Sequence, residues 1–216
     1  MIKGVIFDLD GVLVSTDELH FKAWHRLAQE LGIMDFTRED NRRQKGISRM
    51  ASLEVVLKKS HKTYTESEKL ILAERKNNYY IEFLQELTPE AVLTDVIATL
   101  KMLRRLKVLV GVGSVSKNAP LILEKTGLAK YIDQVSCGLD ITNSKPDPEV
   151  FLVAAGKLNL KNEECLVVED SAAGILAAKA AHMKSLSVGP EYLLLGADYR
   201  SRTLQSETNW QMILQS

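Results

Sequence analysis

The feature that most constrains this chain is the segment Val-Ile-Phe-Asp-Leu-Asp-Gly-Val at residues 5–12. It predicts a buried strand, too short for a helix, that delivers Asp8 and Asp10 to its carboxyl end and stops at Gly11. On a strand the two carboxylates would point to one face, which is costly unless a cation or a shared proton compensates. A divalent metal ion is the natural answer. The alternative, for these four residues alone, is an Asp-x-Asp-Gly turn that merely caps a strand.

The composition narrows the class of partner. Lys plus Arg and Asp plus Glu both number 28, so no net field favours nucleic acid or an anionic membrane. We see no signal-peptide h-region and no apolar stretch long enough to cross a membrane, so we expect a cytoplasmic protein, acting as a monomer. Cys137 and Cys165 lack CxxC spacing, and we expect both to be reduced core residues.

Residues 15–87 have a helical pattern without strand-like alternation. Ser15 and Glu18 fit a capping box for a helix that ends near Leu31, before Gly32. Thr65 and Glu68 fit a second capping box, for a helix to about residue 86. Between them a cap at residue 48 predicts a helix to about residue 60. These residues therefore predict an all-helical domain.

From residue 94 the pattern changes to alternating helices and apolar strands. Strands are expected at 108–112, 134–137, 165–168 and 185–188, and helices at 95–106, before Gly127, from Ser144 and up to Ala181. Such alternation, with strands apolar throughout, predicts an α/β fold with a doubly wound, Rossmann-like parallel sheet. Its core would comprise residues 1–14 and 88–216, with the helical domain 15–87 inserted. The tail after Tyr192 predicts only a closing strand or helix.

Polar residues follow each core strand: Asp8 and Asp10, Ser114, Lys145, and Glu169 with Asp170. In a parallel sheet these ends lie side by side and form one pocket. The carboxylates of Asp8, Glu169 and Asp170 are hard oxygen ligands suited to Mg²⁺, which commonly works beside a phosphate.

The same cluster predicts phosphoryl transfer. Ser114 and Lys145 offer a hydroxyl and a cation for phosphoryl oxygens, and Asp8 is a plausible phosphoryl acceptor. Asp10 could move a proton to or from a substrate oxygen. Taken alone, Ser114 could instead cap a helix, and Lys145 could be a surface lysine.

Three other features have alternatives of equal weight or more. Lys117 and Asn118 could hold a second phosphate or cap a helix. The basic loop at residues 45–49 precedes a helix start, where an anion is favoured, but most such loops are merely solvated. His20 lies on an apolar helical stripe with Trp24, where a histidine is usually a buried residue with a polar partner.

The motifs Asp8-Leu9-Asp10-Gly11, Ser114, Lys145-Pro146 and Glu169-Asp170 resemble, in order and spacing, the four motifs of the haloacid dehalogenase superfamily of phosphotransferases. The resemblance covers the whole chain. Within the superfamily, the segments at residues 20–24, 45–49, 75–77 and 114–118 resemble the β-phosphoglucomutase subfamily. That subfamily interconverts β-glucose 1-phosphate and glucose 6-phosphate through an aspartyl-phosphate and a β-glucose 1,6-bisphosphate.

The resemblance implies a role for each matching residue. Asp8 would be the nucleophile and Asp10 the general acid and base. Mg²⁺ would be bound by Asp8, the Asp10 backbone carbonyl and Asp170, with Glu169 close by. The residues implied in phosphate and sugar binding are His20, Trp24, Lys45, Gly46, Ile47, Ser48, Arg49, Ser52, Lys76, Ser114, Val115, Ser116, Lys117, Asn118 and Lys145.

Some of these roles are more specific. Ser114 and Lys145 would hold the transferred phosphoryl group, whereas Arg49, Lys117 and Asn118 would grip the sugar's other phosphate. The helical domain would act as a cap that opens at hinges near residues 15–16 and 87–88. Val115 departs from the alanine usual in the subfamily, and glycines at 111 and 113 make the preceding strand unusual, which bears on the fine shape of the pocket.

Two other functions fit the same sequence. A sugar phosphate or phosphoglycolate phosphatase would use the same core and let water discharge the aspartyl-phosphate. A grip on a second phosphate by Arg49 is of little use to a monophosphatase, so this residue discriminates between the two. A non-catalytic sugar phosphate sensor could lose Asp8 or Asp10 freely, and this chain keeps both.

Overall fold

The computed structural model describes residues 1–44, 47–205 and 207–216. The described chain divides into two compact units, one made of Met1–Ser15 with Thr88–Ser216 and the other of Thr16–Leu87. Among the described residues, no helix combines the length and the apolar character needed to cross a membrane. The first unit is called the core unit below, and the second the helical unit.

The core unit is built on a six-stranded sheet with the order β3-β2-β1-β4-β5-β6, in which every neighbouring pair is parallel. This confirms the expected α/β fold with a Rossmann-like sheet. The strands are β1 (Gly4–Phe7), β2 (Leu109–Gly113), β3 (Gln134–Ser136), β4 (Cys165–Glu169), β5 (Lys184–Ser187) and β6 (Tyr199–Arg200). The core helices are α5 (Val96–Arg105), α6 (Ala119–Lys125), α7 (Glu149–Lys157), α8 (Ala172–Ala180) and α9 (Trp210–Gln215).

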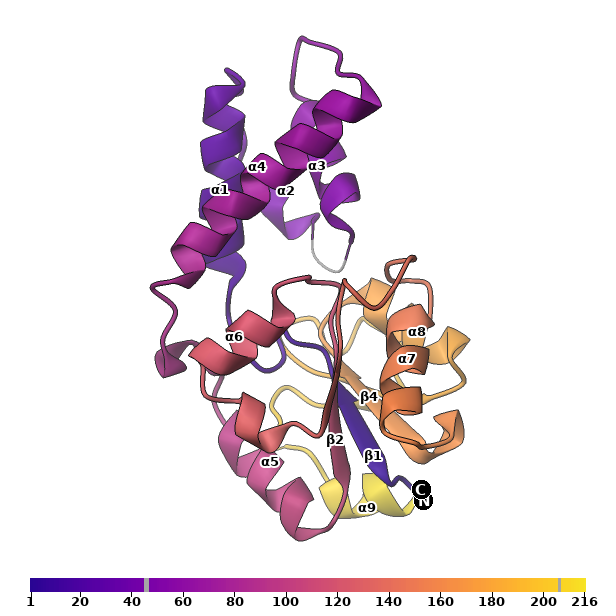
Figure 1. Cartoon of the computed structure of the whole chain (residues 1–216). Helices are drawn as coiled ribbons and strands as arrows, with labels where there is room; N and C mark the ends of the chain where they lie inside the picture. The colour runs from indigo at the N-terminus through magenta and orange to yellow at the C-terminus, as the bar shows by residue number, and fades with distance from the viewer. Residues whose placement is uncertain (45–46, 206) are drawn as a thin grey trace. The chain divides into compact units, whose positions relative to one another are not determined.

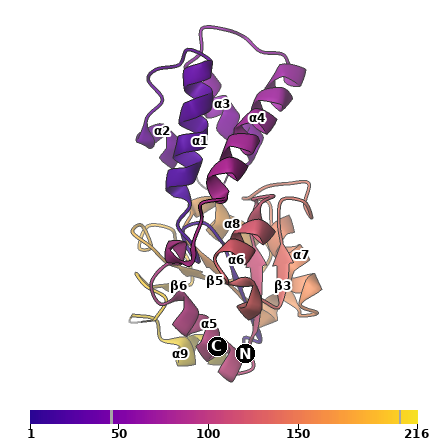
Figure 2. The same cartoon turned by 60° about the vertical axis from the view of Figure 1, so that its left-hand side comes forward.

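Helices cover both faces of this sheet. Figure 1 shows α7 and α8 on one face and α5 and α6 on the other, and Figure 2 shows the same layers from a second direction. Because both faces are covered, all residues of β1 and β4 are buried, which explains why these strands are apolar throughout instead of alternating.

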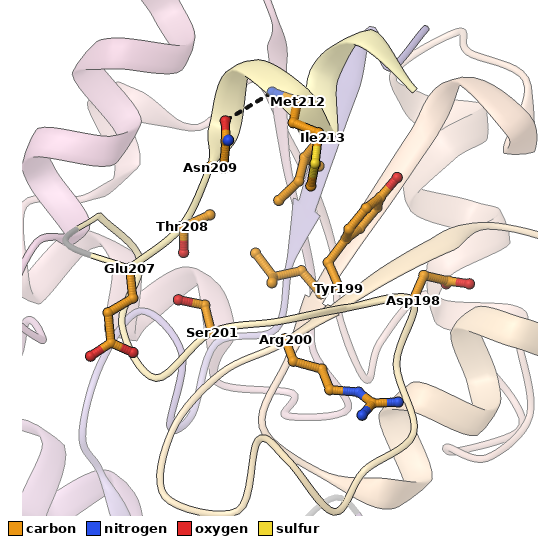
Figure 3. A pocket seen from close by; sticks show the side chains of 10 residues that line it. Asp198, Tyr199, Arg200, Ser201, Glu207, Thr208, Asn209, Met212 and Ile213 are labelled. Atoms are coloured by element: carbon orange, nitrogen blue, oxygen red, sulfur yellow. Dashed lines mark hydrogen bonds between the residues drawn. The ribbon is translucent and has the colours of Figure 1, made fainter.

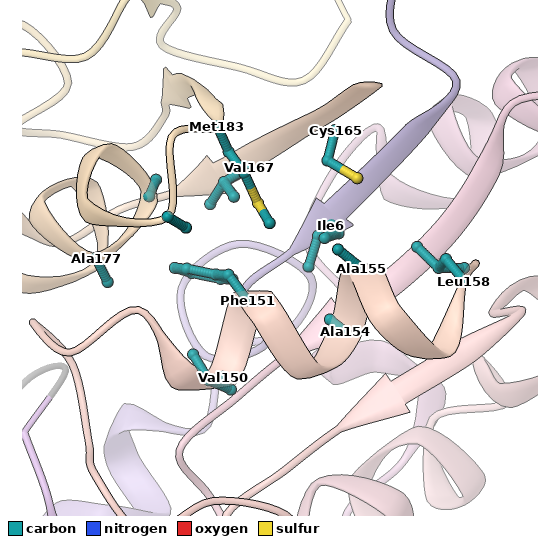
Figure 4. Close-up of a cluster of buried hydrophobic side chains, with 12 residues drawn as sticks. Ile6, Val150, Phe151, Ala154, Ala155, Leu158, Cys165, Val167, Ala177 and Met183 are labelled. Atoms are coloured by element: carbon teal, nitrogen blue, oxygen red, sulfur yellow. The ribbon is translucent and has the colours of Figure 1, made fainter. Parts of the chain in front are cut away.

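The glycine-rich strand β2 makes room for α7. A Cβ atom on Gly113 would lie 2.7 Å from a ring carbon of Phe151, and one on Gly111 would lie 3.0 Å from Leu158. Phe151 of α7 and Leu158, the residue directly after that helix, both belong to a buried cluster with Ile6 of β1 (Figure 4). The two glycines therefore serve helix–sheet packing, an explanation that the sequence alone did not provide.

The helical unit comprises α1 (Asp17–Glu30), α2 (Arg38–Arg42), α3 (Arg49–Leu57) and α4 (Glu66–Leu84). Its own core includes Trp24, Leu27, Leu53 and Leu72, all buried. The predicted capping box at the start of α4 is confirmed, since the Glu68 carboxylate accepts a hydrogen bond from the Thr65 backbone N–H at 2.7 Å. The predicted cap at residue 48 is also confirmed.

The predicted capping box at Ser15 is wrong. The helix α1 begins after Thr16, and neither Ser15 nor Thr16 provides a side-chain cap. The Ser15 N–H donates to the Ala91 carbonyl within the core unit, and the Glu18 carboxylate binds Arg38 at 2.6 Å instead. Both partners, Ala91 and Arg38, are distant in sequence, and their hydrogen bonds replace the local ones that a capping box would make.

The tail contains both a strand and a helix, β6 and α9. They border a pocket of about 380 Å³ at the β6 edge of the sheet (Figure 3). Its wall combines the apolar side chains of Met212 and Ile213 with polar ones from β6 and the segment before α9. The predicted site residues do not line it, so it is a feature separate from the strand ends described next.

Phe151 anchors α7 to the sheet and is fully buried, whereas the neighbouring Leu152 is 39% exposed. We predict that Phe151→Ala lowers the free energy of unfolding by about 3–5 kcal/mol, because it leaves a cavity beneath the sheet. Leu152→Ala on the same helix should cost much less and is the matched control. Chemical denaturation measures both, and equal losses would contradict this account of the core.

Candidate active site

The site forms where β1, β2 and β4 end at the same level. Phe7 is paired with Val112 of β2 and with Val168 of β4, so the residues that follow emerge together. The Asp8 N–H extends the ladder by donating to the Val168 carbonyl at 2.9 Å. The expected convergence of strand ends thus rests on the register of the central strands.

Lys145 joins two of these strand ends. Its Nζ atom lies 2.5 Å from Asp8 Oδ1 and 2.6 Å from Glu169 Oε1, and it also lies over the Phe151 ring. Only 4% of Lys145 is exposed, so the alternative of a surface lysine is wrong. Burial alone would lower the pKa of Lys145, but Asp8 and Glu169 raise it above its usual range, so the side chain is an ammonium ion.

Glu169 is held from the opposite side. Its Oε2 atom accepts hydrogen bonds from the backbone N–H groups of Asp170 and Ser171, both at 3.0 Å, and from the Ser171 hydroxyl at 2.9 Å. A Cβ atom on Gly174 would lie 1.9 Å from the same carboxyl group. Glu169 is therefore fixed in one orientation, with Oε1 directed to Lys145.

Asp8, Glu169 and Asp170 form the acidic group at this edge. Each offers a carboxylate oxygen, and these oxygens lie within 4.8 Å of one another. Burial raises the pKa of Asp8 well above its ordinary value, Lys145 opposes this, and the carboxylates of Glu169, Asp170 and Asp10 raise it further. Crowded hard oxygen ligands with an excess of negative charge fit a divalent cation such as Mg²⁺.

Asp10 does not share a strand face with Asp8, so that part of the sequence argument is wrong. The strand β1 ends at Phe7, and the chain then curls because the N–H groups of Leu13 and Val14 both donate to the Leu9 carbonyl. Gly11 has a φ of 92°, and a Cβ atom there would lie 2.1 Å from Asp170 Oδ2. The turn therefore sets Asp10 beyond the strand and packs the backbone against Asp170.

The segment at residues 114–118 is a chain of tight turns. The Ser116 N–H donates to Ser114 Oγ at 3.1 Å, and the Asn118 N–H donates to Ser116 Oγ at 3.2 Å. Ser114 is buried and does not cap the next helix; Asn118 occupies that position without a side-chain cap bond. Val115, Ser116 and Asn118 are partly exposed and Lys117 is exposed, as ligand-binding residues need to be.

The helical unit brings His20 and Lys76 together. Lys76 Nζ lies 2.9 Å from His20 Nδ1, and above the rings of Trp24 and Tyr80 at 4.7 and 4.6 Å. The His20 ring stacks on Tyr80. A lysine ammonium can only donate, so Nδ1 accepts and the ring proton lies on Nε2. Burial, and then the charges of Lys76 and Arg49, lower the pKa of His20 well below its usual value.

Arg49 at the start of α3 is held by α4. Its Nη1 atom donates to Glu74 at 3.1 Å and its Nη2 atom to Asn77 Oδ1 at 2.9 Å. Ser48 caps α3 and Ser52 is buried within it, while Ile47 lies partly exposed just before it. The predicted site residues Lys45 and Gly46 lie outside the described residues.

Sequence analysis missed three residues in this group: Glu74, Asn77 and Tyr80. The sequence signal that could have pointed to them is helical spacing. Tyr80 follows Lys76 by four residues and Asn77 follows Glu74 by three, so each pair lies on one face of a helix. Neither spacing predicts that the pairs meet His20 and Arg49 from other helices.

Comparison with known proteins identifies the family. The model of haloacid dehalogenase-like hydrolases matches residues 5–188, and the chain belongs to this family. It is 40% identical over 199 residues to the β-phosphoglucomutase of Bacillus subtilis, covering 91% of this chain and 88% of that protein. It is also 31% identical over 186 residues to a phosphorylated carbohydrates phosphatase of Thermotoga maritima, covering 86% and 84%.

The fold agrees with these relatives. The crystal structure of the β-phosphoglucomutase of Clostridium difficile matches with a TM-score of 0.91 and 35% identity, covering 100% of this chain and 96% of that one. The expected family resemblance, and with it the expectation of an enzyme related to phosphotransferring isomerases, is therefore confirmed.

The contact between Lys76 and His20 makes a spectroscopic prediction. In ¹⁵N NMR spectra, His20 should be the Nε2–H tautomer and should titrate well below pH 6.5, the value of an unperturbed histidine here. Lys76→Met should raise this pKa, because a neighbouring positive charge is removed. An unchanged pKa in the variant would contradict the inferred coupling.

The same shift has a consequence for stability. The unfolded chain binds a proton at His20 near pH 6.5, whereas the folded chain does not. The free energy of unfolding therefore keeps the contribution of His20 above that pH and loses it as the pH falls below it.

Proposed function

We propose that this protein is a β-phosphoglucomutase, which interconverts β-glucose 1-phosphate and glucose 6-phosphate through a β-glucose 1,6-bisphosphate. The observation that carries the proposal is the Asp8–Lys145–Glu169 ion cluster, in a chain 40% identical to the Bacillus subtilis mutase. The proposed substrates are small sugar phosphates, and the proposed setting is the cytoplasm, with the protein acting as a monomer.

In the proposed reaction, Asp8 is the nucleophile. A carboxylate oxygen of Asp8 attacks phosphorus in the bisphosphate, the bond from phosphorus to the sugar oxygen breaks, and Asp10 gives a proton to that oxygen. This sugar monophosphate leaves, and a molecule of the other monophosphate then presents its free hydroxyl to the aspartyl-phosphate, which re-forms the bisphosphate. Asp10 takes the proton of that hydroxyl as its oxygen attacks phosphorus, and Asp8 is released.

The charges around Asp8 suit this chemistry. Lys145, already 2.5 Å from Asp8 Oδ1, would neutralise an equatorial phosphoryl oxygen, and the Ser114 hydroxyl would donate to another. We propose that Asp8, the Asp10 carbonyl and Asp170 hold Mg²⁺, with Glu169 nearby. When bound, this ion would offset the negative charge of the phosphoryl group and of the crowded carboxylates.

We propose that the helical unit is a cap that binds the rest of the substrate. Arg49, together with Lys117 and Asn118 of the core unit, would grip the phosphate that is not reacting. His20, Trp24 and Lys76 would position the sugar ring with the segment from Lys45 to Ser52. The neutral His20, with its proton on Nε2, would donate a hydrogen bond to a sugar oxygen without adding charge.

The main alternative is a sugar phosphate phosphatase, and the 31% identity to the Thermotoga maritima phosphatase favours it as the second candidate. One coupled assay separates the two functions. The purified protein receives β-glucose 1-phosphate, Mg²⁺ and a trace of the bisphosphate, and glucose 6-phosphate and free phosphate are both measured. Glucose 6-phosphate without stoichiometric free phosphate is expected, and release of free phosphate alone would overturn the proposal.

Substitution of the two aspartates tests their separate roles. Asp8→Asn should abolish turnover with the fold intact, because the neutral amide cannot accept a phosphoryl group. Asp10→Asn should still bind Mg²⁺ in calorimetric titration, because the proposed ligand is a carbonyl, yet lose rate by about two to four powers of ten. Loss of Mg²⁺ binding in Asp10→Asn would mean that its carboxylate is a ligand.

Arg49→Ala tests the grip on the distal phosphate. Loss of a charge-assisted contact worth about 1.5–3 kcal/mol should weaken mutase activity by about one to two powers of ten. Hydrolysis of acetyl phosphate, which has no distal phosphate, should change little. If both activities fall together, or neither changes, Arg49 is not a phosphate clamp and the phosphatase alternative gains support.

A further inference from the structure

A turn at residues 137–140, just after β3, rests against the segment at residues 114–118. The Gly138 N–H donates to the Ser116 carbonyl at 3.2 Å. A Cβ atom on Gly138 would lie 2.4 Å from the Val115 carbonyl oxygen and 3.0 Å from the Lys117 nitrogen. The turn therefore approaches the backbone of the segment as closely as a glycine permits.

This turn is held rigidly by a carboxylate. Asp140 Oδ2 accepts a hydrogen bond from the Cys137 N–H at 2.8 Å, and the Asp140 N–H donates to the Cys137 carbonyl at 2.9 Å. These two bonds close the turn on itself, and the Gly138 N–H is thereby directed at Ser116.

The last residue of α7 fixes the turn to the sheet. Lys157 Nζ donates to Asp140 Oδ1 and to the Val135 carbonyl of β3, both at 2.7 Å. A continuous set of contacts thus runs from α7 through Asp140 and Gly138 to the backbone at Ser116. It does not pass through Asp8, Lys145 or Glu169, which are held by their own contacts.

We propose that Gly138, Asp140 and Lys157 are positioning residues that set the shape of the segment at residues 114–118 for binding the phosphate that is not reacting. This inference rests on the proposed function, in which Lys117 and Asn118 bind that phosphate. Ser114 is less dependent on the turn, because its N–H donates to the Ser136 carbonyl of β3 at 3.0 Å. The turn therefore affects binding of the distal phosphate more than transfer of the phosphoryl group.

The chain offers a matched pair of glycine substitutions. Gly138→Ala places a methyl group against backbone atoms, whereas Gly156→Ala, on α7, meets nothing within 4 Å. Misplacement of binding groups by a fraction of an ångström is costly, so Gly138→Ala should raise KM for β-glucose 1-phosphate by about tenfold or more. The KM for acetyl phosphate should rise by a much smaller factor, and Gly156→Ala should leave both constants unchanged.

Asp140→Asn provides a second test that does not depend on whether Gly138→Ala folds. It keeps an oxygen for the Cys137 N–H but loses the ion pair with Lys157, so KM for β-glucose 1-phosphate should rise about two- to fivefold with kcat nearly unchanged. Lys157→Met should have a similar effect, and the double variant should be no worse than the more impaired single variant. Thermal melting of each variant separates this effect from loss of folded protein.

The outcomes separate this inference from the proposed function. Wild-type protein without mutase activity would overturn both. If the wild type is an active mutase and folded Gly138→Ala has an unchanged KM for β-glucose 1-phosphate, the positioning role alone is overturned. If Gly138→Ala does not fold, an unchanged KM in Asp140→Asn has the same meaning. Equal increases in KM for acetyl phosphate and β-glucose 1-phosphate would also overturn it.

Discussion

The ion pair between Lys145 and Asp8 is the interaction on which the rest of the site depends. Asp8 is buried among three other carboxylates, and an uncompensated charge there would be neutralised by a proton. The ammonium of Lys145 opposes that tendency, although the pKa of Asp8 stays raised, and it links Asp8 to Glu169. A protonated Asp8 would be a poor nucleophile, so this pairing connects the electrostatics of the sheet edge directly to the proposed chemistry.

The surrounding structure can be understood as support for this arrangement. The Oε2 atom of Glu169 is occupied by donors from residues 170 and 171, which leaves Oε1 for Lys145. Gly174 and Gly11 lack side chains where the carboxyl groups of Glu169 and Asp170 come closest. At Gly174 the requirement is space alone, and at Gly11 a left-handed conformation adds to it. Replacement at either position would move a charged group instead of an apolar one.

The sequence predicted the sheet well because parallel strands buried on both faces are apolar throughout, and residues 5–7 and 165–168 stand out clearly. It also predicted that Asp8, Glu169 and Asp170 meet, because each follows the end of a central parallel strand, and that Lys145 joins them. It failed for Asp10 and Ser15, whose positions depend on a turn and on a backbone bond to Ala91.

Two further features could not be located from local patterns. The strand β6 has two residues and is too short to show a periodic pattern. It is fixed by the Asp198 carboxylate, which accepts hydrogen bonds from the backbone N–H and the hydroxyl of Ser185. The roles of Gly111, Gly113 and Gly138 are likewise defined by atoms that approach from distant segments. Spacing in the sequence predicts secondary structure, whereas the residue type at these positions is determined by tertiary contacts.

The contacts of Arg49 bear on how a mutase differs from a phosphatase. Arg49 is bound to Glu74, whose side chain is 62% exposed, and to Asn77. To bind a phosphate, the guanidinium must give up at least part of this pairing, so the net gain is smaller than for an unpaired arginine. For a phosphatase that would only weaken binding. For the proposed mutase a moderate grip is an advantage, because the bisphosphate must be released and bound again in the opposite orientation within each catalytic cycle. A carboxylate that competes for the arginine would favour that exchange, and it lies on the same helix as Lys76.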